Sequence, residues 1–387
     1  MRVPELSVII LNYNVRYFLD LCVYSVLRAT ENRAIEVIVV DNDSSDESVD
    51  MVRKKYPQVI VQANKKNYGF AKAYNKAVAK AKGKYICILN PDTVLTEDTF
   101  DRTLAYYKRL ENPGLLGIRL IDGKGDFLPE SKRNVPTPKV ALSKILPVPN
   151  KIAPSYYADH LGETENGSVS ILVGAFMLVE KSKYTAVGGF DEDYFMYGED
   201  IDLSYKMLKA GYQNYYMGDV AAIHFKGEST VKDEIYIRRF YGAMHLFYKK
   251  HFSTQTVVDS IVPKLIDKLS KLHKIPIRTK RDNLAPYYWV SDQKVSHSLP
   301  LVYGTTPVPS SSTFIGRTIT SGTVIWDCDG VSFCRMIERM YANRGKECTY
   351  LIKLTSEQFL IGSNYSDRQG EVLHLSSTPI SVESKAS

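Results

Sequence analysis

The first 90 residues alternate short apolar runs with segments whose apolar residues recur at helical spacing, and this alternation restricts the possible folds most. The apolar runs predict buried strands at 6–11, 35–40, 59–63 and 85–89. The segments between them predict helices at 19–27, 44–55 and 70–81. This order predicts an α/β fold, in which a mostly parallel, Rossmann-like sheet is covered by helices on both faces.

Polar residues follow three of these strands at the points where the strands end. They are Asn12, Asp41 and Asp92, the last presented by Pro91. Ligands of open parallel sheets bind beyond the carboxyl ends of the strands. We therefore expect these side chains to gather at one edge of the sheet and to form part of a binding site.

The pattern changes after residue 115 to shorter strands and longer loops. Strands are predicted at 170–180 and, as two short pieces, within 212–225, with a helix at 201–210. The Pro- and Ser-rich stretch 305–312 is typical of a linker. A strand, a helix and a strand at 323–326, 333–341 and 349–354 predict a small second α/β unit.

We accordingly divide the chain into four parts. They are a main domain over 1–250, a basic amphipathic helix and linker over 251–300, a small α/β domain over 301–375 and a disordered tail over 376–387. Apolar residues at helical spacing over 257–272, with lysines nearby, allow two interpretations. This helix either packs on its own domain or lies on an anionic lipid surface.

The formal net charge of +7 favours anionic partners without choosing among them. The positive charge is dispersed, which argues against a nucleic-acid-binding module. The five cysteines form neither a closed disulfide set nor a zinc-binding spacing. No apolar stretch is long enough to span a bilayer and no secretory signal opens the chain, so we expect a cytosolic protein.

Four short segments carry candidate chemistry, each beside a simpler interpretation. Asp41 suits a nucleotide base or ribose, although the Ser/Asp cluster after it could merely cap a helix. Gly69 allows a close backbone approach or a positive φ, or an ordinary turn. Asp92 suits a divalent cation that bridges phosphates, although Pro-Asp turns are common. His224 ends a short strand and is structural unless another group pairs with it.

The segment 188–202 is the densest in functional side chains. It holds six carboxylates among glycines and aromatic residues. Glu199 or Asp200 could simply cap the helix that follows. A cap, however, needs only one acid. The presence of several acids beside aromatic residues favours a site in which a carboxylate takes a proton from a hydroxyl group and aromatic side chains form the pocket walls.

Taken together and in order, these segments resemble family 2 glycosyltransferases, the inverting group with the GT-A fold, and in particular the rhamnosyltransferase-like branch of bacterial surface-polysaccharide synthesis. The similarity covers about residues 5–250. It is carried by 7–14, Val40-Asp41-Asn42 with Ser44 and Asp46, Asn67, Gly69, Phe70 and Asn75, Asn90-Pro91-Asp92, Gly174-Ala175, 188–191, and Glu199, Asp200 and Asp202.

The resemblance implies a role for each matching residue. Donor-binding residues would be Asn12, Asp41, Asn67, Gly69 and, by a loose correspondence, Arg133. Mg²⁺ or Mn²⁺ would be held by Asp92 and His224, with Asn90 replacing the first acid of the family's Asp-x-Asp signature. Asp200 would be the catalytic base, with Glu199 beside it. The acceptor pocket would include Gly189, Phe190, Asp191 and Tyr197.

The activity implied is inverting transfer from a nucleotide-diphosphate sugar, of the dTDP-rhamnose or UDP-hexose type, to a glycan or lipid-linked glycan, with peripheral contact to the inner face of the cell membrane. Two alternatives remain. A sugar-phosphate nucleotidyltransferase would have a Gly-rich loop with Arg after the first strand, where this chain has Asn12-Tyr13-Asn14. An inert sugar-nucleotide-binding protein would not need the intact set of acids.

Overall fold

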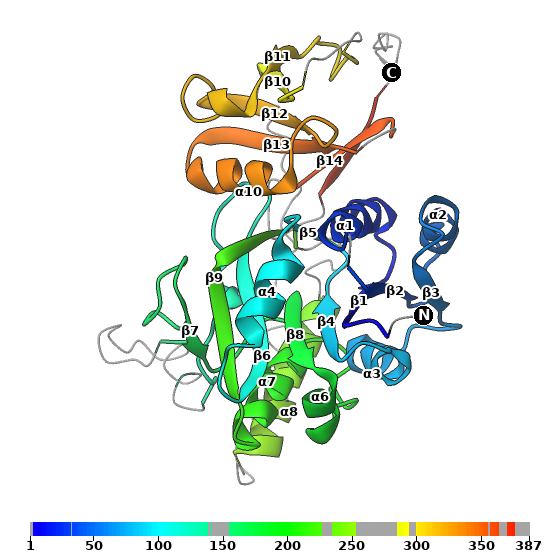
Figure 1. The fold of residues 1–387 in the computed structure, drawn as a ribbon, viewed down its shortest axis with the longest axis vertical. Coiled ribbons are helices and arrows are strands. Elements are labelled where there is room, and N and C mark those ends of the chain that lie inside the picture. Colours follow the sequence, from blue (N-terminus) through cyan, green and yellow to red (C-terminus); the bar gives the residue numbers. More distant parts are fainter. Residues whose placement is uncertain are drawn as a thin grey trace.

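Two β-sheets organise the chain, as Figure 1 shows for this computed structural model. The structure describes residues 3–31, 33–137, 140, 155–226, 234–252, 285–293, 299–354, 357–363 and 370–375. The larger sheet has nine strands, in the order β3-β2-β1-β4-β8-β6-β9-β5, with β7 paired to β9. The smaller sheet has six strands, in the order β11-β10-β12-β13-β14-β15.

The predicted α/β fold is confirmed, and the first seven elements form nearly where the sequence places them. The strands are β1 (Leu6–Asn12), β2 (Ile35–Asp41), β3 (Ile60–Ala63) and β4 (Tyr85–Leu89), and the helices are α1 (Arg16–Ala29), α2 (Ser48–Lys55) and α3 (Phe70–Lys80). These four strands are parallel, and Asn12 pairs in register with Asp41. The helix α2 begins four residues later than predicted, because Asp46 binds the backbone N–H groups of Arg16 and Ser48.

The second half of the large sheet differs more from expectation. It comprises β5 (Thr93–Leu95), β6 (Pro113–Ile121), β7 (Asn166–Val169), β8 (Phe176–Glu180) and β9 (Gln213–His224). The strand predicted at 170–180 is reduced to β8. The two short strands predicted within 212–225 are one long strand, β9, whose pairing with β6 shifts between Met217 and Ala221. This irregularity explains why the apolar alternation breaks there.

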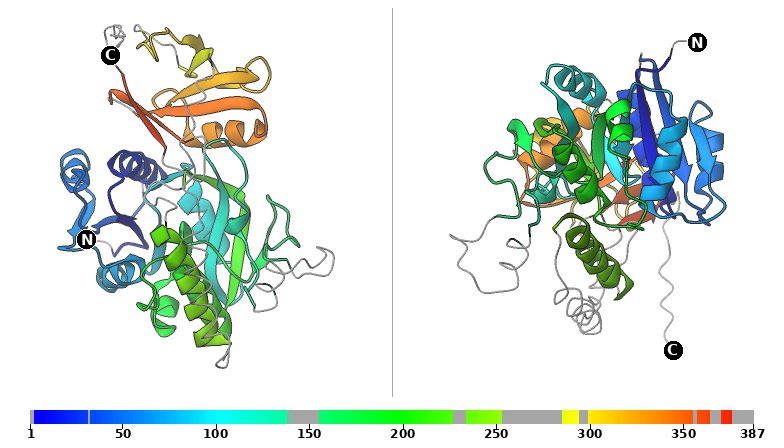
Figure 2. Two further views of the ribbon diagram at one scale, coloured as in Figure 1. Left: turned by 180° about the vertical axis from the view of Figure 1, so that it is seen from behind. Right: turned by 90° about the horizontal axis from the view of Figure 1, so that it is seen from below.

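Helices cover both faces of the large sheet. Side chains of α1, α2 and α4 (Thr99–Tyr107) pack in one hydrophobic cluster with β1 and β4. Side chains of α3, α6 (Lys181–Ala186) and α7 (Glu199–Lys209) pack in a cluster on the opposite face. The helix α8 (Glu234–His251) lies against the first turn of α7, and Phe247 is fully buried between them. Figure 2 shows α8 from two further directions.

The smaller sheet and its helix pack directly against the larger sheet. Its strands are β10 (Tyr287–Val290), β11 (Val308–Ser310), β12 (Ser321–Asp327), β13 (Glu347–Lys353), β14 (Phe359–Gly362) and β15 (Glu371–His374). The helix α10 (Phe333–Ala342) lies between the two sheets (Figure 1), in a hydrophobic cluster that also contains residues of α1, β5 and β9. The Glu97 carboxylate accepts hydrogen bonds from the N–H groups of Phe333 and Cys334 at the start of α10.

The expected boundaries near this unit need correction. The stretch 305–312, predicted as a linker, contains β11, which pairs with β10 through Pro309 and its neighbours. The strand β10 falls within 251–300, the range expected to hold only a helix and a linker. The apolar stripe at 257–272 and the tail at 376–387 lie outside the described residues. In the part of the chain that the structure describes, no helix is both long enough and apolar enough to cross a bilayer.

Candidate active site

The ends of β1 and β2 carry the first part of the site. Asn12 Nδ2 donates to Asp41 Oδ1 at 2.8 Å and to Ser44 Oγ at 3.0 Å. The N–H of Ser44 donates to Asp41 Oδ2. Both side chains are buried, and Asn12 Oδ1 has no hydrogen-bond partner among the described residues. A buried acceptor without a partner is costly, so this oxygen suits the N–H of a bound group.

Asn42 connects this pair to the predicted Asn67 and Gly69. Its Nδ2 donates to Asn67 Oδ1 at 2.9 Å and to the carbonyl of Gly69 at 3.1 Å. Gly69 has φ +78°, and a Cβ there would lie 2.5 Å from the Phe195 carbonyl oxygen. Only glycine fits both conditions. Both conditions agree with the predicted need for glycine at this position. The Ser/Asp cluster after Asp41 does cap α2 in part, because Asp46 Oδ1 accepts a hydrogen bond from the N–H of Ser48, although Glu47 at the N-cap makes no side-chain capping bond.

The end of β4 and the end of β9 bring Asp92 and His224 together. The strands β5 and β9 pair so that Thr93 lies opposite His224. His224 Nε2 lies 3.3 Å from Asp92 Oδ1 and 3.3 Å from Asn90 Nδ2. Both Asp92 and His224 are buried. His224 therefore has a carboxylate partner, which was the condition for expecting a role beyond a structural one.

This carboxylate–imidazole pair fits a divalent cation of the Mg²⁺ or Mn²⁺ type. A carboxylate oxygen and a ring nitrogen that face each other across a short gap are suitable ligands for such an ion. The described residues contain no group of three or more His, Cys, Asp or Glu side chains arranged to hold a metal. Asp92 and His224 would thus supply two ligands and leave the remaining positions to substrate and water.

The first turn of α7 presents Asp200, and its carboxylate is held on three sides. Arg133 donates to Asp200 Oδ2 at 2.7 Å, and the N–H of Gly174 donates to the same oxygen at 3.2 Å. The N–H of Ile201 donates to Oδ1. Burial lowers the pKa of Arg133, but the adjacent Asp200 carboxylate raises it more, so the guanidinium remains charged. The pair fixes the orientation of Asp200 within the site.

Glu199 lies beside this pair and is buried as well. Burial, followed by the negative charge of Asp200, raises the pKa of Glu199 to about 8. The carboxyl group therefore holds a proton at neutral pH, and Oε2 has no hydrogen-bond partner among the described residues. Neither acid is the N-cap of α7, since that position is Gly198 in the left-handed conformation. The simpler interpretation of the two acids as a helix cap is wrong.

Backbone contacts connect these three parts. The N–H of Asn90 donates to the carbonyl of Ala175, and the preceding residue, Gly174, contacts Asp200. On the other side, the N–H of Phe70, next to Gly69, donates to the carbonyl of Phe195 in the loop before α7 at 2.8 Å. The segments that carry Asp41, Asp92 and Asp200 are thus neighbours at the carboxyl edge of β1, β2 and β4.

The predicted acceptor-pocket residues lie differently. Phe190 is 1% exposed and packs against Phe70, Tyr74 and Tyr184, so its side chain belongs to the core and cannot form a pocket wall. Gly189 adjoins the same core, because a Cβ there would lie 2.7 Å from Tyr184. Residues 189 and 190 are therefore placed by contacts with the aromatic core.

Asp191 and Tyr197 face helix α8. Asp191 lies 2.5 Å from Lys250 Nζ, and the Tyr197 ring packs against Phe240. The buried Phe190 side chain is thus not a pocket wall, whereas the assignment of Gly189, Asp191 and Tyr197 to the acceptor pocket stays a prediction. In this structure they support the loop that precedes Glu199.

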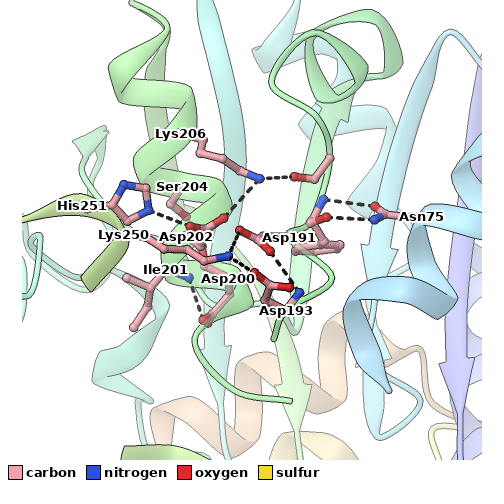
Figure 3. A network of polar contacts seen from close by, with 12 residues as sticks. Asn75, Asp191, Asp193, Asp200, Ile201, Asp202, Ser204, Lys206, Lys250 and His251 are labelled. Carbon is pink, nitrogen blue, oxygen red and sulfur yellow. Dashed lines mark hydrogen bonds and ion pairs between the residues drawn. The ribbon is translucent and has the colours of Figure 1, made fainter. Parts of the chain in front are cut away.

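Sequence reasoning missed two sets of residues. Asn42 was part of a recognised segment, but its bridging role depends on contacts with residues 25 and 27 positions later. Lys250 and His251, which contact the acidic segment from α8, had no local signal because single basic residues on an amphipathic helix are ordinary (Figure 3).

The mostly parallel sheet and its polar carboxyl edge agree with the GT-A glycosyltransferase fold that the resemblance predicts. Residues 7–188 match the family model described as glycosyl transferase family 2. Residues 7–188 form a domain of this family, and the chain is a glycosyltransferase.

Similar proteins include the N-acetylglucosaminyl-diphospho-decaprenol L-rhamnosyltransferase of Mycobacterium tuberculosis strain H37Rv, which is 28% identical over 241 residues, 59% of this chain and 78% of the relative. Rhamnosyltransferase WbbL of Escherichia coli strain K12 is 33% identical over 171 residues, 41% of this chain and 61% of that relative. Among solved structures, the mannosyltransferase PcManGT from Pyrobaculum calidifontis aligns with 70% of this chain and 71% of its own, with 17% identity and a TM-score of 0.44.

Proposed function

We propose that this glycosyltransferase inverts the anomeric carbon and moves a sugar from a nucleotide-diphosphate donor to a glycan or lipid-linked glycan acceptor. The observation that carries the proposal is the arrangement of Asp41, Asp92 and Asp200 on neighbouring segments of one sheet edge. A donor that consists of a base, a diphosphate and a sugar has three chemically different parts. Three separate polar clusters at one edge of the sheet suit these three parts.

The nucleoside would bind at the ends of β1 and β2. Asn12 Oδ1, buried and without a partner among the described residues, would accept a hydrogen bond from the base. Asp41 would hold Asn12 in the required orientation through its 2.8 Å contact. Asn67 and Gly69, joined to β2 by Asn42, would form the adjoining wall.

The diphosphate would lie at Asp92 and His224, the residues suited to hold Mg²⁺ or Mn²⁺. When bound there, such a cation offsets the negative charge that develops on the leaving nucleoside diphosphate. Asn90 Nδ2 lies 3.3 Å from His224 Nε2, so this contact would give way to a cation bound through that nitrogen.

Asp200 would act as the general base. Its carboxylate accepts the proton of an acceptor hydroxyl while that oxygen forms a bond to the anomeric carbon, and the bond from this carbon to the diphosphate oxygen breaks with its electron pair. One displacement inverts the configuration. Arg133 and the Gly174 N–H hold Asp200 for this step, and protonated Glu199 would donate a hydrogen bond to the bound sugar.

The names of the relatives suggest the substrates. Two similar proteins are named rhamnosyltransferases, and the name of one of them includes a diphospho-decaprenol acceptor. We therefore propose a dTDP-rhamnose or UDP-hexose donor and an acceptor that is part of a surface polysaccharide. A lipid-linked acceptor would bring the enzyme to a membrane surface, for which the basic apolar stripe at 257–272 is suited.

A screen of nucleotide sugars tests this proposal. The purified chain is incubated with dTDP-rhamnose, UDP-glucose, UDP-N-acetylglucosamine or GDP-mannose, with Mn²⁺, Mg²⁺ or EDTA, and release of the nucleoside diphosphate is measured with and without a diphospholipid-linked sugar. We expect one donor to be consumed, with a strong requirement for the cation. Tight donor binding without consumption under any condition would favour the inert sugar-nucleotide-binding protein instead.

A further inference from the structure

Helix α8 contacts the catalytic segment through two polar clasps that the proposed reaction does not use. Figure 3 shows side chains of α7, of α8 and of the loop after residue 188 pointing toward one another. One clasp is formed by Asp202 and His251, and the other by Lys250 with Asp191 and Asp193. Both join the last turn of α8 to residues close to Glu199 and Asp200 in the chain.

The first clasp centres on a buried carboxylate. The Asp202 side chain is 1% exposed and lies in the first turn of α7, two residues after Asp200. His251 Nε2 donates to Asp202 Oδ1 at 2.7 Å, and Lys206 Nζ lies 3.1 Å from Oδ2. A buried carboxylate is stable only with such partners, so loss of either one would disturb the turn that holds it.

The imidazole itself is fixed by packing. Its ring lies 4.9 Å from the rings of Tyr205 and Phe247, measured between centroids, and its side chain is 9% exposed. Tyr205 belongs to α7 and Phe247 to α8. His251 therefore connects the two helices by both a hydrogen bond and aromatic contacts.

The second clasp fixes the loop that leads into α7. Lys250 Nζ lies 2.5 Å from Asp191 Oδ2 and 2.6 Å from Asp193 Oδ2. Lys206, already part of the first clasp, donates to the carbonyl of Gly189 at 2.6 Å. The beginning of the loop is thus tied to both helices.

The same loop reaches the donor side of the site. The carbonyl of Phe195 accepts a hydrogen bond from the N–H of Phe70. Gly198, the residue before Glu199, lies against Ala243 of α8, because a Cβ on Gly198 would come within 3.2 Å of the Ala243 Cβ. A shift of α8 would therefore move the loop, Glu199 and Asp200 together.

We propose that His251 is a positioning residue, which acts through Asp202 to hold the first turn of α7 and so sets the place of Asp200 and Glu199, and that Lys250 holds the preceding loop. This inference rests on the proposed function for its effect on catalysis. The contacts themselves predict the rigidity of residues 189–204 whether or not that function is correct.

Two substitutions at one position test it. His251→Phe keeps an aromatic ring but removes the donor to Asp202, whereas His251→Gln keeps a donor. Because small displacements of a catalytic group are costly, we expect His251→Phe to lower kcat about 10- to 100-fold. The Kd for the nucleoside diphosphate with Mn²⁺ should stay within about threefold of wild type, since Asn12, Asp92 and His224 are untouched. His251→Gln should recover most of kcat.

Hydrogen exchange gives a readout that does not depend on activity. In His251→Phe the amides of 189–204 should exchange about tenfold faster, while those of β1 and β2 stay unchanged. Lys250→Ala should loosen 189–195 in the same way, and Lys249→Ala, at an exposed neighbouring position, serves as the matched control. Exchange in 189–204 identical to wild type would overturn the positioning role, even if the chain transfers no sugar. Wild-type kcat in His251→Phe, in an enzyme that does transfer sugar, would overturn it equally.

Discussion

Acidic residues lie at the carboxyl edges of both sheets of this chain, but they differ in their exposure to solvent. At the carboxyl edge of the large sheet, Asp41, Asp92 and Asp200 are 2%, 5% and 9% exposed. At the corresponding edge of the small sheet, Asp292 and Asp329 are exposed and Asp327 is half-buried. Buried carboxylates need compensating partners, whereas exposed ones are hydrated at little cost. Burial, rather than the presence of acids at strand ends, distinguishes the candidate active site.

The local partners strengthen this contrast. Asp292 accepts hydrogen bonds from Ser311 Oγ and from the N–H and Oγ of Ser312, all within the small unit. Burial raises the pKa of Asp292, but these hydrogen bonds lower it more, and the net shift is downward. At the carboxyl edge of the large sheet, Asn12, Glu199 and His224 each keep a buried polar atom without a partner among the described residues, unlike the Asp292 carboxylate. Such atoms can form a hydrogen bond with a ligand, whereas both carboxylate oxygens of Asp292 already accept hydrogen bonds from Ser311 and Ser312.

The largest effect expected from this comparison is that of Asp200→Asn. Removal of the proposed base should lower transfer by about 10²- to 10⁴-fold, while donor binding is retained. Initial rates and a binding titration with nucleoside diphosphate measure the two quantities, and thermal unfolding controls for the loss of the Arg133 partner. Full turnover by this variant would end the assignment of Asp200 as the base.

Asp92→Ala comes next. Loss of one of the two proposed metal ligands should weaken the Mn²⁺-dependent part of donor binding by about 10- to 100-fold. Metal titrations of donor affinity, followed by calorimetry, measure this. Asp101→Ala, which removes an exposed acid from helix α4, is the matched control and should have no effect. If both variants respond to Mn²⁺ as the wild type does, the ion binds elsewhere.

Glu199→Gln tests whether burial of the Glu199 carboxylate lowers the free energy of unfolding at high pH. The pKa of Glu199 is about 8 in the folded chain, against an ordinary value of 4.5, so folding requires the uptake of a proton between these pH values. The stability that protonated Glu199 contributes is complete below pH 4.5 and is lost as the pH rises to 8. Glutamine has no such loss.

The variant should therefore gain stability relative to the wild type as the pH rises. The gain should be near zero at pH 4.5 and about 4–5 kcal/mol at pH 8 and above. Urea unfolding between pH 5 and 9 measures the difference. A difference that does not change with pH would show that Glu199 is solvated in the folded chain.

The smallest effect is expected on the other sheet. Asp327→Asn and Asp329→Asn should leave the rate of transfer within about twofold of the wild type, because both residues belong to the smaller sheet, at the end of β12 and just after it. Assays under the conditions used for Asp200→Asn make the comparison direct. A loss of activity comparable to that of Asp200→Asn would mean that the small sheet also contributes to the site.

The sequence predicted the arrangement at the ends of β1, β2 and β4 better than that of residues 188–202, for a physical reason. Strands β1, β2 and β4 are continuous apolar runs, and a parallel sheet necessarily brings their polar ends, such as Asn12 and Asp41, to one edge. The Arg133–Asp200 pair could not be predicted in this way, since it joins a loop to a helix 67 residues later. Phe190 was misplaced because an aromatic residue beside several acids suits a pocket and a core equally well until its neighbours are known.

The boundary errors have a related origin. Periodicity describes a strand only while its pairing is regular, and β9 shifts its register against β6 between Met217 and Ala221. The strand β11 contains Pro309 and occupies the edge of the small sheet, where proline is tolerated but the sequence resembles a linker. Both errors arise where tertiary pairing overrides local pattern.

A crystal structure of the Asp200→Asn variant with a nucleotide-diphosphate sugar and Mn²⁺ tests the central claim most directly. We predict the base against Asn12 and Asp41, the ion between Asp92 and His224, and the anomeric carbon facing position 200. A nucleotide bound away from the ends of β1 and β2, or an ion without Asp92 among its ligands, would contradict this account of the site.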